Sequence, residues 1–191
     1  MVGILALQGD FYKHKSILDK LEVNNIYVKN FEDLKKTNAL IIPGGESSVL
    51  SMLIDRYSLR DRLIKYSQSF SIFGTCAGMI MMSKTRGLGH NVEPLNIMDF
   101  AISRNSWGPQ INSFEKEVDF KNFRINKFSA IFIRAPKVLK FNNDIKVDYI
   151  NKKEVVILDD GRHMACSFHP ELGQDIRLHE YFLNKFYNEK K

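Results

Sequence analysis

The sequence predicts an α/β fold of three layers, in which helices flank a mostly parallel central sheet. Through the first half, short apolar segments alternate with amphipathic helical patterns, which is the order of elements in a parallel sheet. The first segment, residues 2–7, is almost continuously apolar, as in a strand buried on both faces. A length of 191 residues fits one domain, so we expect residues 1–191 to form a single unit.

Each expected strand of the first half ends at a polar residue or at a Pro/Gly signal. The expected strands cover residues 2–7, 26–28, 39–42 and 71–73. The expected helices cover residues 11–21, 49–57, 59–66 and 79–82. The first helix follows Asp10 and places Ile17, Leu18 and Leu21 on one face, which predicts that this face packs on the sheet.

The second half has a different pattern. Between residues 95 and 168, strand-like segments follow one another without helices, which predicts extra antiparallel strands or hairpins at an edge of the sheet. Residues 175–187 have the period of an amphipathic helix, with Ile176, Leu183 and Phe186 on its apolar side.

Composition excludes several classes of protein. The formal charge is +6, but no aromatic residues are interleaved with the lysines, so we expect no nucleic-acid partner. No apolar run approaches the roughly 18–20 residues that span a membrane, and the N-terminus lacks the basic start of a signal peptide. Two cysteines form no disulfide framework, and no Cys/His spacing resembles a metal site. We therefore expect a cytoplasmic protein without metal or cofactor.

The strongest chemical motif places Cys76 within Gly-Thr-Cys-Ala-Gly, between an expected strand and a helix. Such a turn exposes a nucleophile in a tight bend, and the following helix N-terminus stabilises a thiolate and an oxyanion. By itself the motif fits equally well a buried cysteine beside glycines that only turn the chain. Cys166 lies in a strand-like segment without this turn, where we expect a structural cysteine. His14 and His179 stand beside lysine or glutamate in helical patterns, and we expect them to be solvated.

His169 and Glu171 follow the strand that contains Cys166. Because Pro170 keeps His169 out of the helical region, the two side chains can face the same way. A cysteine nucleophile needs a base, and the base needs an orienting carboxylate. Alone, the motif is better explained by a helix start whose positive end attracts Glu171. Combined with Cys76, it predicts a Cys-His-Glu triad.

A third motif, Pro-Gly-Gly-Glu-Ser at residues 43–47, ends the third expected strand. Adjacent glycines let the backbone approach a ligand closely and direct N–H groups at it. The spacing of a phosphate-binding loop is absent, and Glu46 would repel phosphate. The motif instead suits a ligand with an ammonium group and an oxyanion.

Together these motifs resemble the class I (triad) glutamine amidotransferases, which have a flavodoxin-like fold. Four further segments are similar to one branch, the glutaminase subunits of pyridoxal 5′-phosphate synthases. They are Leu-Gln-Gly at 7–9, Arg-Asn-Ser at 104–106, Ser-Phe-Glu at 113–115 and Ile-Arg-Ala-Pro at 133–136. The resemblance runs from residue 3 to the last helix. The cysteine and histidine motifs indicate only the superfamily, whereas Leu-Gln-Gly and Ile-Arg-Ala-Pro indicate the branch.

The resemblance implies that Cys76, His169 and Glu171 hydrolyse L-glutamine to glutamate and ammonia through a thioester. It also implies an oxyanion hole formed by the backbone N–H groups of Gly45 and Ala77. The residues that it implies for glutamine binding are Gly44, Gly45, Glu46, Ser47, Arg104, Ile133 and Arg134.

The implied partner is a (β/α)₈-barrel synthase subunit that receives the ammonia, with Gln8 and Gly9 as a candidate contact surface. This sequence departs from the family pattern at Pro109, where arginine is usual, and at Asn112, where aspartate is usual. These departures put in question any contact that the usual side chains make.

Three alternatives stay open. The nearest is the glutaminase subunit of another amidotransferase, such as imidazole glycerol phosphate synthase, which should lack the Ile-Arg-Ala-Pro segment. A free-standing cysteine hydrolase on the same fold would need neither a carboxylate-binding arginine nor a synthase. A non-enzymatic basic binding module would need none of the triad residues.

Overall fold

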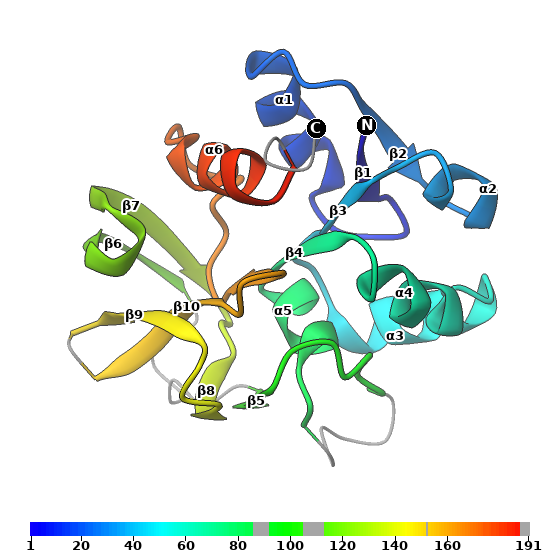
Figure 1. Cartoon of the computed structure of the whole chain (residues 1–191). Coiled ribbons are helices and arrows are strands. Elements are labelled where there is room, and N and C mark those ends of the chain that lie inside the picture. Colours follow the sequence, from blue (N-terminus) through cyan, green and yellow to red (C-terminus); the bar gives the residue numbers. More distant parts are fainter. Residues whose placement is uncertain (86–91, 105–112, 152, 188–191) are drawn as a thin grey trace.

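The computed structural model describes residues 1–85, 92–104, 113–151 and 153–187 (Figure 1). Pro109 and Asn112 lie outside the described residues. The centre is a seven-stranded sheet of order β2-β1-β3-β4-β11-β10-β9. Its strands are β1 (Val2–Leu5), β2 (Asn25–Val28), β3 (Ala39–Ile42), β4 (Ser71–Thr75), β9 (Lys146–Ile150), β10 (Glu154–Asp159) and β11 (Met164–Cys166). From β2 to β11 neighbouring strands are parallel, while β10 and β9 are antiparallel to their neighbours. The expected fold class is confirmed.

Helices cover both faces of this sheet. They are α1 (Phe11–Lys20), α2 (Phe31–Leu34), α3 (Ser47–Arg56), α4 (Arg60–Ser67), α5 (Ala77–Met82) and α6 (Arg177–Phe182), with 3-10 and π-helical turns at Lys121–Phe123 and Leu183–Tyr187. One apolar cluster packs α2 to α5 against one face, and a second packs α1 and α6 against the other (Figure 1). The four-residue α2 was not expected; the side chain of Asn30 caps it by accepting from the Asp33 N–H at 3.0 Å.

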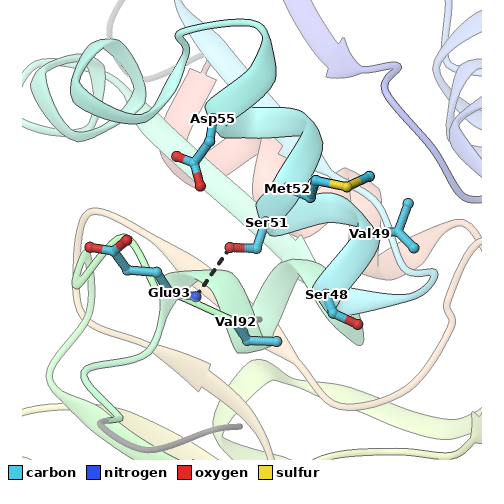
Figure 2. A pocket seen from close by; sticks show the side chains of 7 residues that line it. All are labelled: Ser48, Val49, Ser51, Met52, Asp55, Val92 and Glu93. Carbon is cyan, nitrogen blue, oxygen red and sulfur yellow. Dashed lines mark hydrogen bonds between the residues drawn. The ribbon is translucent and has the colours of Figure 1, made fainter. Parts of the chain in front are cut away.

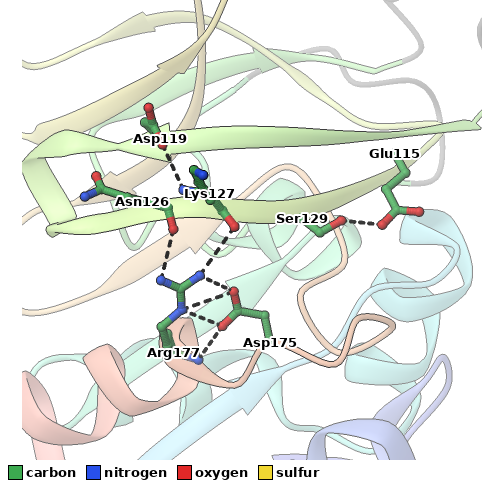
Figure 3. A network of polar contacts seen from close by, with 7 residues as sticks. All are labelled: Glu115, Asp119, Asn126, Lys127, Ser129, Asp175 and Arg177. Carbon is green, nitrogen blue, oxygen red and sulfur yellow. Dashed lines mark hydrogen bonds and ion pairs between the residues drawn. The ribbon is translucent and has the colours of Figure 1, made fainter.

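Two antiparallel pairs lie outside the main sheet. They are β5 (Phe100–Ser103) with β8 (Lys137–Phe141), and the hairpin of β6 (Ser113–Phe120) with β7 (Ile125–Ile133). Figure 3 shows how the hairpin is attached to the start of α6: Arg177 donates to the Asn126 carbonyl at 2.9 Å and forms an ion pair with Asp175 at 2.5 Å. Phe128 and Phe132 of the same hairpin pack on buried Phe168. The hairpin thus has a fixed position beside the segment that follows β11.

The topology brings three chain segments to one edge of the sheet. Strands β3, β4 and β11 are adjacent and parallel, so their carboxyl ends meet. Gly44 follows β3, Cys76 follows β4 and His169 follows β11 within three residues. The three sequence motifs, far apart in the chain, therefore meet at the carboxyl edge of the sheet.

Among the described residues, no helix combines the length and the apolar character that crossing a membrane requires.

Candidate active site

Cys76 occupies a sharp bend between β4 and α5. Its backbone has φ 47° and ψ −101°, an unfavourable conformation for a residue with a side chain. The bend is held on both sides: the Cys76 N–H donates to the Cys166 carbonyl at 2.9 Å, and the Cys76 carbonyl accepts from Ile80 at 3.1 Å. A methyl group on Gly78 would lie 2.0 Å from the Ile42 carbonyl oxygen, so only glycine fits there. The tight turn expected from the sequence is present.

The imidazole of His169 lies between Cys76 and Glu171. Its Nδ1 atom is 2.7 Å from Glu171 Oε1, and its ring also interacts with the Cys76 side chain. All three side chains are buried. The backbone of Gly44 packs directly against His169, because a Cβ at Gly44 would come within 2.4 Å of the His169 ring.

Two opposing effects set the proton affinity of His169. Burial lowers its pKa, but hydrogen bonds and charge interactions with Cys76 and Glu171 outweigh burial and raise it to about 10. The imidazole is therefore protonated at neutral pH. A protonated imidazole beside a sulfur nucleophile can give its proton to a leaving amine.

Cys166 differs from Cys76 in every respect that matters for reactivity. Its side chain is fully buried within β11 and directs its thiol to the Phe168 carbonyl at 3.4 Å. Burial raises the pKa of the Cys166 thiol well above its ordinary value. The geometry agrees with the expectation that Cys166 only fills the core.

A cleft of about 570 Å³ opens beside Cys76. Its lining residues are Asp10, Gly45, Glu46, Ser47, Cys76, Ile80, Arg104, Ser113, Ile133, Arg134 and His169. The cleft thus unites most of the residues that the sequence resemblance implies. It adds Asp10, Ile80 and Ser113, which sequence reasoning did not single out as site residues.

Two of the three charged side chains expected to bind glutamine, Glu46 and Arg104, contact each other. Arg104 Nη2 lies 3.2 Å from Glu46 Oε1. Glu46 also caps α3, since its Oε2 accepts from the Val49 N–H at 2.8 Å and from the Ser48 hydroxyl. Burial raises the pKa of Glu46, but these hydrogen bonds and Arg104 outweigh it and lower the pKa. A substrate zwitterion can replace this internal ion pair with one contact to each partner.

The end of β7 also borders Cys76. The Ile133 carbonyl is 3.8 Å from Cys76 Sγ, and the next residue, Arg134, has φ 44°. The His169 N–H donates to the Ile131 carbonyl at 2.8 Å, which fixes the strand against His169. Both Ile133 and Arg134 are exposed in the cleft.

Gln8 and Gly9 lie against the Gly-Gly loop. A Cβ on Gly9, whose φ is 82°, would be 1.8 Å from the Gly44 carbonyl oxygen. The Gln8 side chain accepts from the Glu46 N–H at 3.1 Å and leaves no room for a side chain on Gly45. The two residues therefore support the Gly-Gly loop; their role as a partner surface stays a prediction.

The expectation that His14 and His179 are solvated is wrong, because both are fully buried behind Glu171. The sequence contained the signal: Ile17 and Leu18 follow His14 by three and four residues, so His14 shares the apolar face of its helix. Phe182 has the same relation to His179.

One group of three described side chains is compact enough for a metal ion: Asp10, His169 and Glu171 place one ligand atom each within 4.8 Å of one another. His169 and Glu171, however, already bond to each other through Nδ1 and Oε1. We therefore assign no metal to this group.

A second hollow, of about 490 Å³, lies along α3 (Figure 2). Ser51 accepts there from the Glu93 N–H at 3.1 Å, and Asp55 and Glu93 line the rim. Its lining includes neither cysteine nor histidine, so the described part of this hollow has no nucleophile–base pair.

Comparison with known proteins agrees with this geometry. The SNO glutamine amidotransferase family matches residues 4–188. This chain belongs to that family. The pyridoxal 5′-phosphate synthase subunit PdxT of Pseudothermotoga lettingae is 44% identical over 95% of this chain and 93% of that protein. PdxT of Methanocaldococcus jannaschii is 40% identical over 96% of each chain.

Solved structures agree at the level of the fold. A crystal structure described as a glutamine amidotransferase has a TM-score of 0.86 at 38% identity and covers 96% of this chain and 97% of its own. A glutamine amidotransferase of Thermotoga maritima has a TM-score of 0.59 at 13% identity, covering 98% of this chain and 83% of its own. The second match shows the shared fold alone.

Proposed function

We propose that this chain hydrolyses L-glutamine with a Cys76-His169-Glu171 triad and delivers the ammonia to the synthase subunit of a pyridoxal 5′-phosphate synthase. The observation that carries the proposal is the His169 imidazole, which hydrogen-bonds Glu171 and interacts with Cys76 in the same cleft. The near full-length similarity to PdxT proteins supports the choice of pathway.

The first half-reaction forms a thioester. The Cys76 sulfur attacks the side-chain carbonyl carbon of glutamine, and the carbonyl π electrons move to oxygen. Backbone N–H groups of Gly45 and Ala77 stabilise this oxyanion, at about 3 kcal/mol per donor. Ala77 suits the role because it begins α5, where N–H groups have no partner within the helix. As the oxyanion re-forms the carbonyl, the C–N bond breaks, and protonated His169 gives its proton to the departing nitrogen.

The second half-reaction releases glutamate. Neutral His169 removes a proton from water, and the resulting hydroxide attacks the thioester carbon. Collapse of the tetrahedral intermediate breaks the C–S bond, so that sulfur leaves as thiolate and the imidazole remains protonated. Glu171 holds the ring in one orientation through both halves.

The charges at the mouth of the cleft suit the zwitterionic end of glutamine. Glu46 suits the ammonium group, and a guanidinium of Arg104 or Arg134 suits the carboxylate in a bidentate contact. Gly44, Ser47 and Ile133 supply the backbone surface around it.

Hydrolysis becomes useful when the ammonia reaches an acceptor before it escapes to water. We place that acceptor in a (β/α)₈-barrel synthase subunit that docks beside the cleft, with Gln8 and Gly9 at the contact. We place the complex in the cytoplasm, where the free thiols of Cys76 and Cys166 stay reduced.

The proposal is tested by measuring glutamate and ammonia release with and without the synthase subunit. Cys76→Ala should lose at least about 10³-fold in kcat in the complex, because the nucleophile is gone. Cys166→Ala should retain nearly the wild-type rate, because its side chain only fills the core.

Ammonia release by the Cys76→Ala complex would refute the nucleophile assignment. A wild-type rate that does not depend on the synthase would favour the free-standing cysteine hydrolase instead.

A further inference from the structure

Glu171 has a second oxygen atom that the triad does not use. Oε1 bonds His169, whereas Oε2 is buried and has no hydrogen bond from any residue in the described ranges. The nitrogen that faces it is His14 Nε2, 3.5 Å away, with both side chains fully buried. A buried carboxylate oxygen that lacks a donor is costly, so the identity of its neighbour matters.

His14 is held from behind by a second buried histidine. His14 Nδ1 lies 2.9 Å from His179 Nε2, and both side chains have zero exposure. His14 comes from α1 and His179 from α6, the two helices that cover this face of the sheet. The ring of Phe73 packs edge-on against His179, which fixes its plane. A line of side chains therefore runs from the helical layer through Glu171 to His169.

Which ring nitrogen of each histidine carries the proton follows from which of these nitrogens has a hydrogen-bond partner. If His179 donates from Nε2 to His14 Nδ1, then the proton of neutral His14 sits on Nε2 and points toward Glu171. The atom left without a partner, His179 Nδ1, is then only a lone pair. In the opposite arrangement His179 Nδ1 is a buried N–H without an acceptor, and a lone pair of His14 faces the carboxylate. The first arrangement avoids both penalties.

Both histidines are neutral in this environment. Burial lowers the pKa of His14 well below its ordinary value, and His179 and His169 reinforce the effect. Burial likewise lowers the pKa of His179 to about 3. His14 therefore offers Glu171 a hydrogen-bond donor without adding a second positive charge beside protonated His169.

Several other titratable groups surround this line. Asp10, at the start of α1, places a carboxylate oxygen within 4.8 Å of ligand atoms of His169 and Glu171. Cys76 interacts with His169, and buried Cys166 interacts with Glu171. The Thr75 hydroxyl is 3.4 Å from His14 Nε2 and can share its proton. None of these groups from β4, β11 or α1 gives Glu171 Oε2 a hydrogen bond.

We propose that His14, supported by His179, is a positioning residue of this enzyme: its Nε2 faces the free oxygen of Glu171 at 3.5 Å, and this polar contact limits how Glu171, and with it the ring of His169, can turn. The inference rests on the proposed function only for its effect on turnover. The tautomers of the histidines can be measured whether or not glutamine is the substrate.

The direct test is a long-range ¹H–¹⁵N correlation spectrum of the histidine side chains in the full chain, recorded against pH. The sequence has five histidines, which single variants assign. His14 and His179 should be neutral with the proton on Nε2, and His169 should carry both protons at neutral pH. A His14 signal with its proton on Nδ1 would overturn the proposal.

Variants then test the coupling. His14→Phe should shift the titration midpoint of His169 by about one pH unit, because Glu171 loses the polar neighbour of its second oxygen and then interacts differently with the imidazolium. It should lower kcat roughly tenfold in the synthase complex and leave KM unchanged, because the cleft is not altered. His14→Gln, whose amide can donate to Oε2, should restore most of both quantities.

The matched control is His163→Gln, another buried histidine, which accepts from the Ile72 N–H at the opposite end of β4. It should lower the melting temperature without moving the His169 midpoint. If His14→Phe fails to fold, the tautomers of the wild-type histidines and the His169 midpoint in His14→Gln test the inference instead. An unchanged His169 midpoint in His14→Phe, or an equal shift in His163→Gln, would overturn the inference. Absence of glutaminase activity in the wild type would refute the proposed function while the spectra still decided the inference.

Discussion

Glu171 and Asp159 are both buried carboxylates next to β11, yet they have different kinds of partner. Asp159, 1% exposed at the end of β10, pairs with the ammonium group of Lys185 and accepts from Tyr181 at 2.8 Å and from the Gly161 N–H at 2.8 Å. Glu171, 3% exposed, faces two imidazoles. An ammonium ion keeps its charge through neutral pH, whereas an imidazole can exchange a proton.

The difference teaches that burial alone does not identify a functional acid. Through Lys185, Asp159 joins β10 to the π-helical turn Leu183–Tyr187. Lys146 of β9 extends this network, because its ammonium group donates to the Tyr181 hydroxyl at 3.0 Å. The partners of Asp159 stabilise the fold. Of the two imidazoles that face Glu171, His14 stays neutral, whereas His169 gains and loses a proton in the proposed reaction.

The largest effect should come from Glu171→Gln. The amide keeps the shape but can donate to His169 Nδ1, which favours the wrong ring tautomer. We expect kcat for glutamine hydrolysis to fall by about 10³–10⁴-fold, with a melting temperature close to that of the wild type. Steady-state kinetics of the synthase complex measures this. A loss below tenfold would show that Glu171 does not orient the base.

Asp159→Asn should give the reverse result. It leaves Lys185 without its anion, and since that side chain is 33% exposed, solvent compensates part of the loss. We expect a loss of about 2 kcal/mol in unfolding free energy, measured by urea denaturation, with kcat per folded molecule unchanged. An Asp159→Asn variant that is stable but inactive would contradict the conclusion that Asp159 stabilises the fold and has no role in catalysis.

The pH dependence of stability sharpens the same contrast. The pKa of His169 is raised to about 10 from an ordinary 6.5, so the folded state binds this proton more tightly than the unfolded state does. The resulting stabilisation is fully present below pH 6.5 and is lost as pH rises through about 10. Denaturation curves should show this gradual decline. In Cys76→Ala, which removes one group that raises the pKa, the decline should move to lower pH.

Tyr181→Phe should have the smallest effect. It removes the hydrogen bond to Asp159 and the one accepted from Lys146 but leaves the ion pair between Asp159 and Lys185, so we expect a loss of about 1 kcal/mol in unfolding free energy and no change in kcat. Tyr149→Phe, at an exposed tyrosine of β9, is the control and should stay within a few tenths of a kcal/mol. Equal losses in both variants would contradict the role given to the Tyr181 hydroxyl.

Much of this molecule was predictable from local patterns. Continuous apolar segments indicated β1 and β3, and the glycines around Cys76 indicated the bend, because both are dictated by neighbouring residues. The short α2 was missed, since four residues carry almost no periodicity. The closing helix was expected as one regular helix, but after Phe182 it becomes a π-helical turn, a hydrogen-bond shift without a sequence signal.

The contacts within the site depended on tertiary packing. The ion pair between Glu46 and Arg104 joins two segments. From the sequence, each was expected to contact glutamine separately. The line from His14 to Glu171 joins α1 to the segment after β11, a pairing that only the assembled sheet creates. Even so, the apolar neighbours of His14 and His179 along their helices were a usable signal of burial.

The hydrogen bond from the Cys76 N–H to the Cys166 carbonyl has a consequence for how such proteins diverge. It continues the register of β4 and β11, in which Thr75 lies opposite Cys166. The distance between Cys76 and His169 is therefore set by a few paired backbone groups and not by the long stretch of sequence between them. Insertions, deletions and altered helices in that stretch can accumulate without moving the two reacting groups apart. This tolerance gives a physical reason why folds only 13–15% identical to this chain superimpose on it.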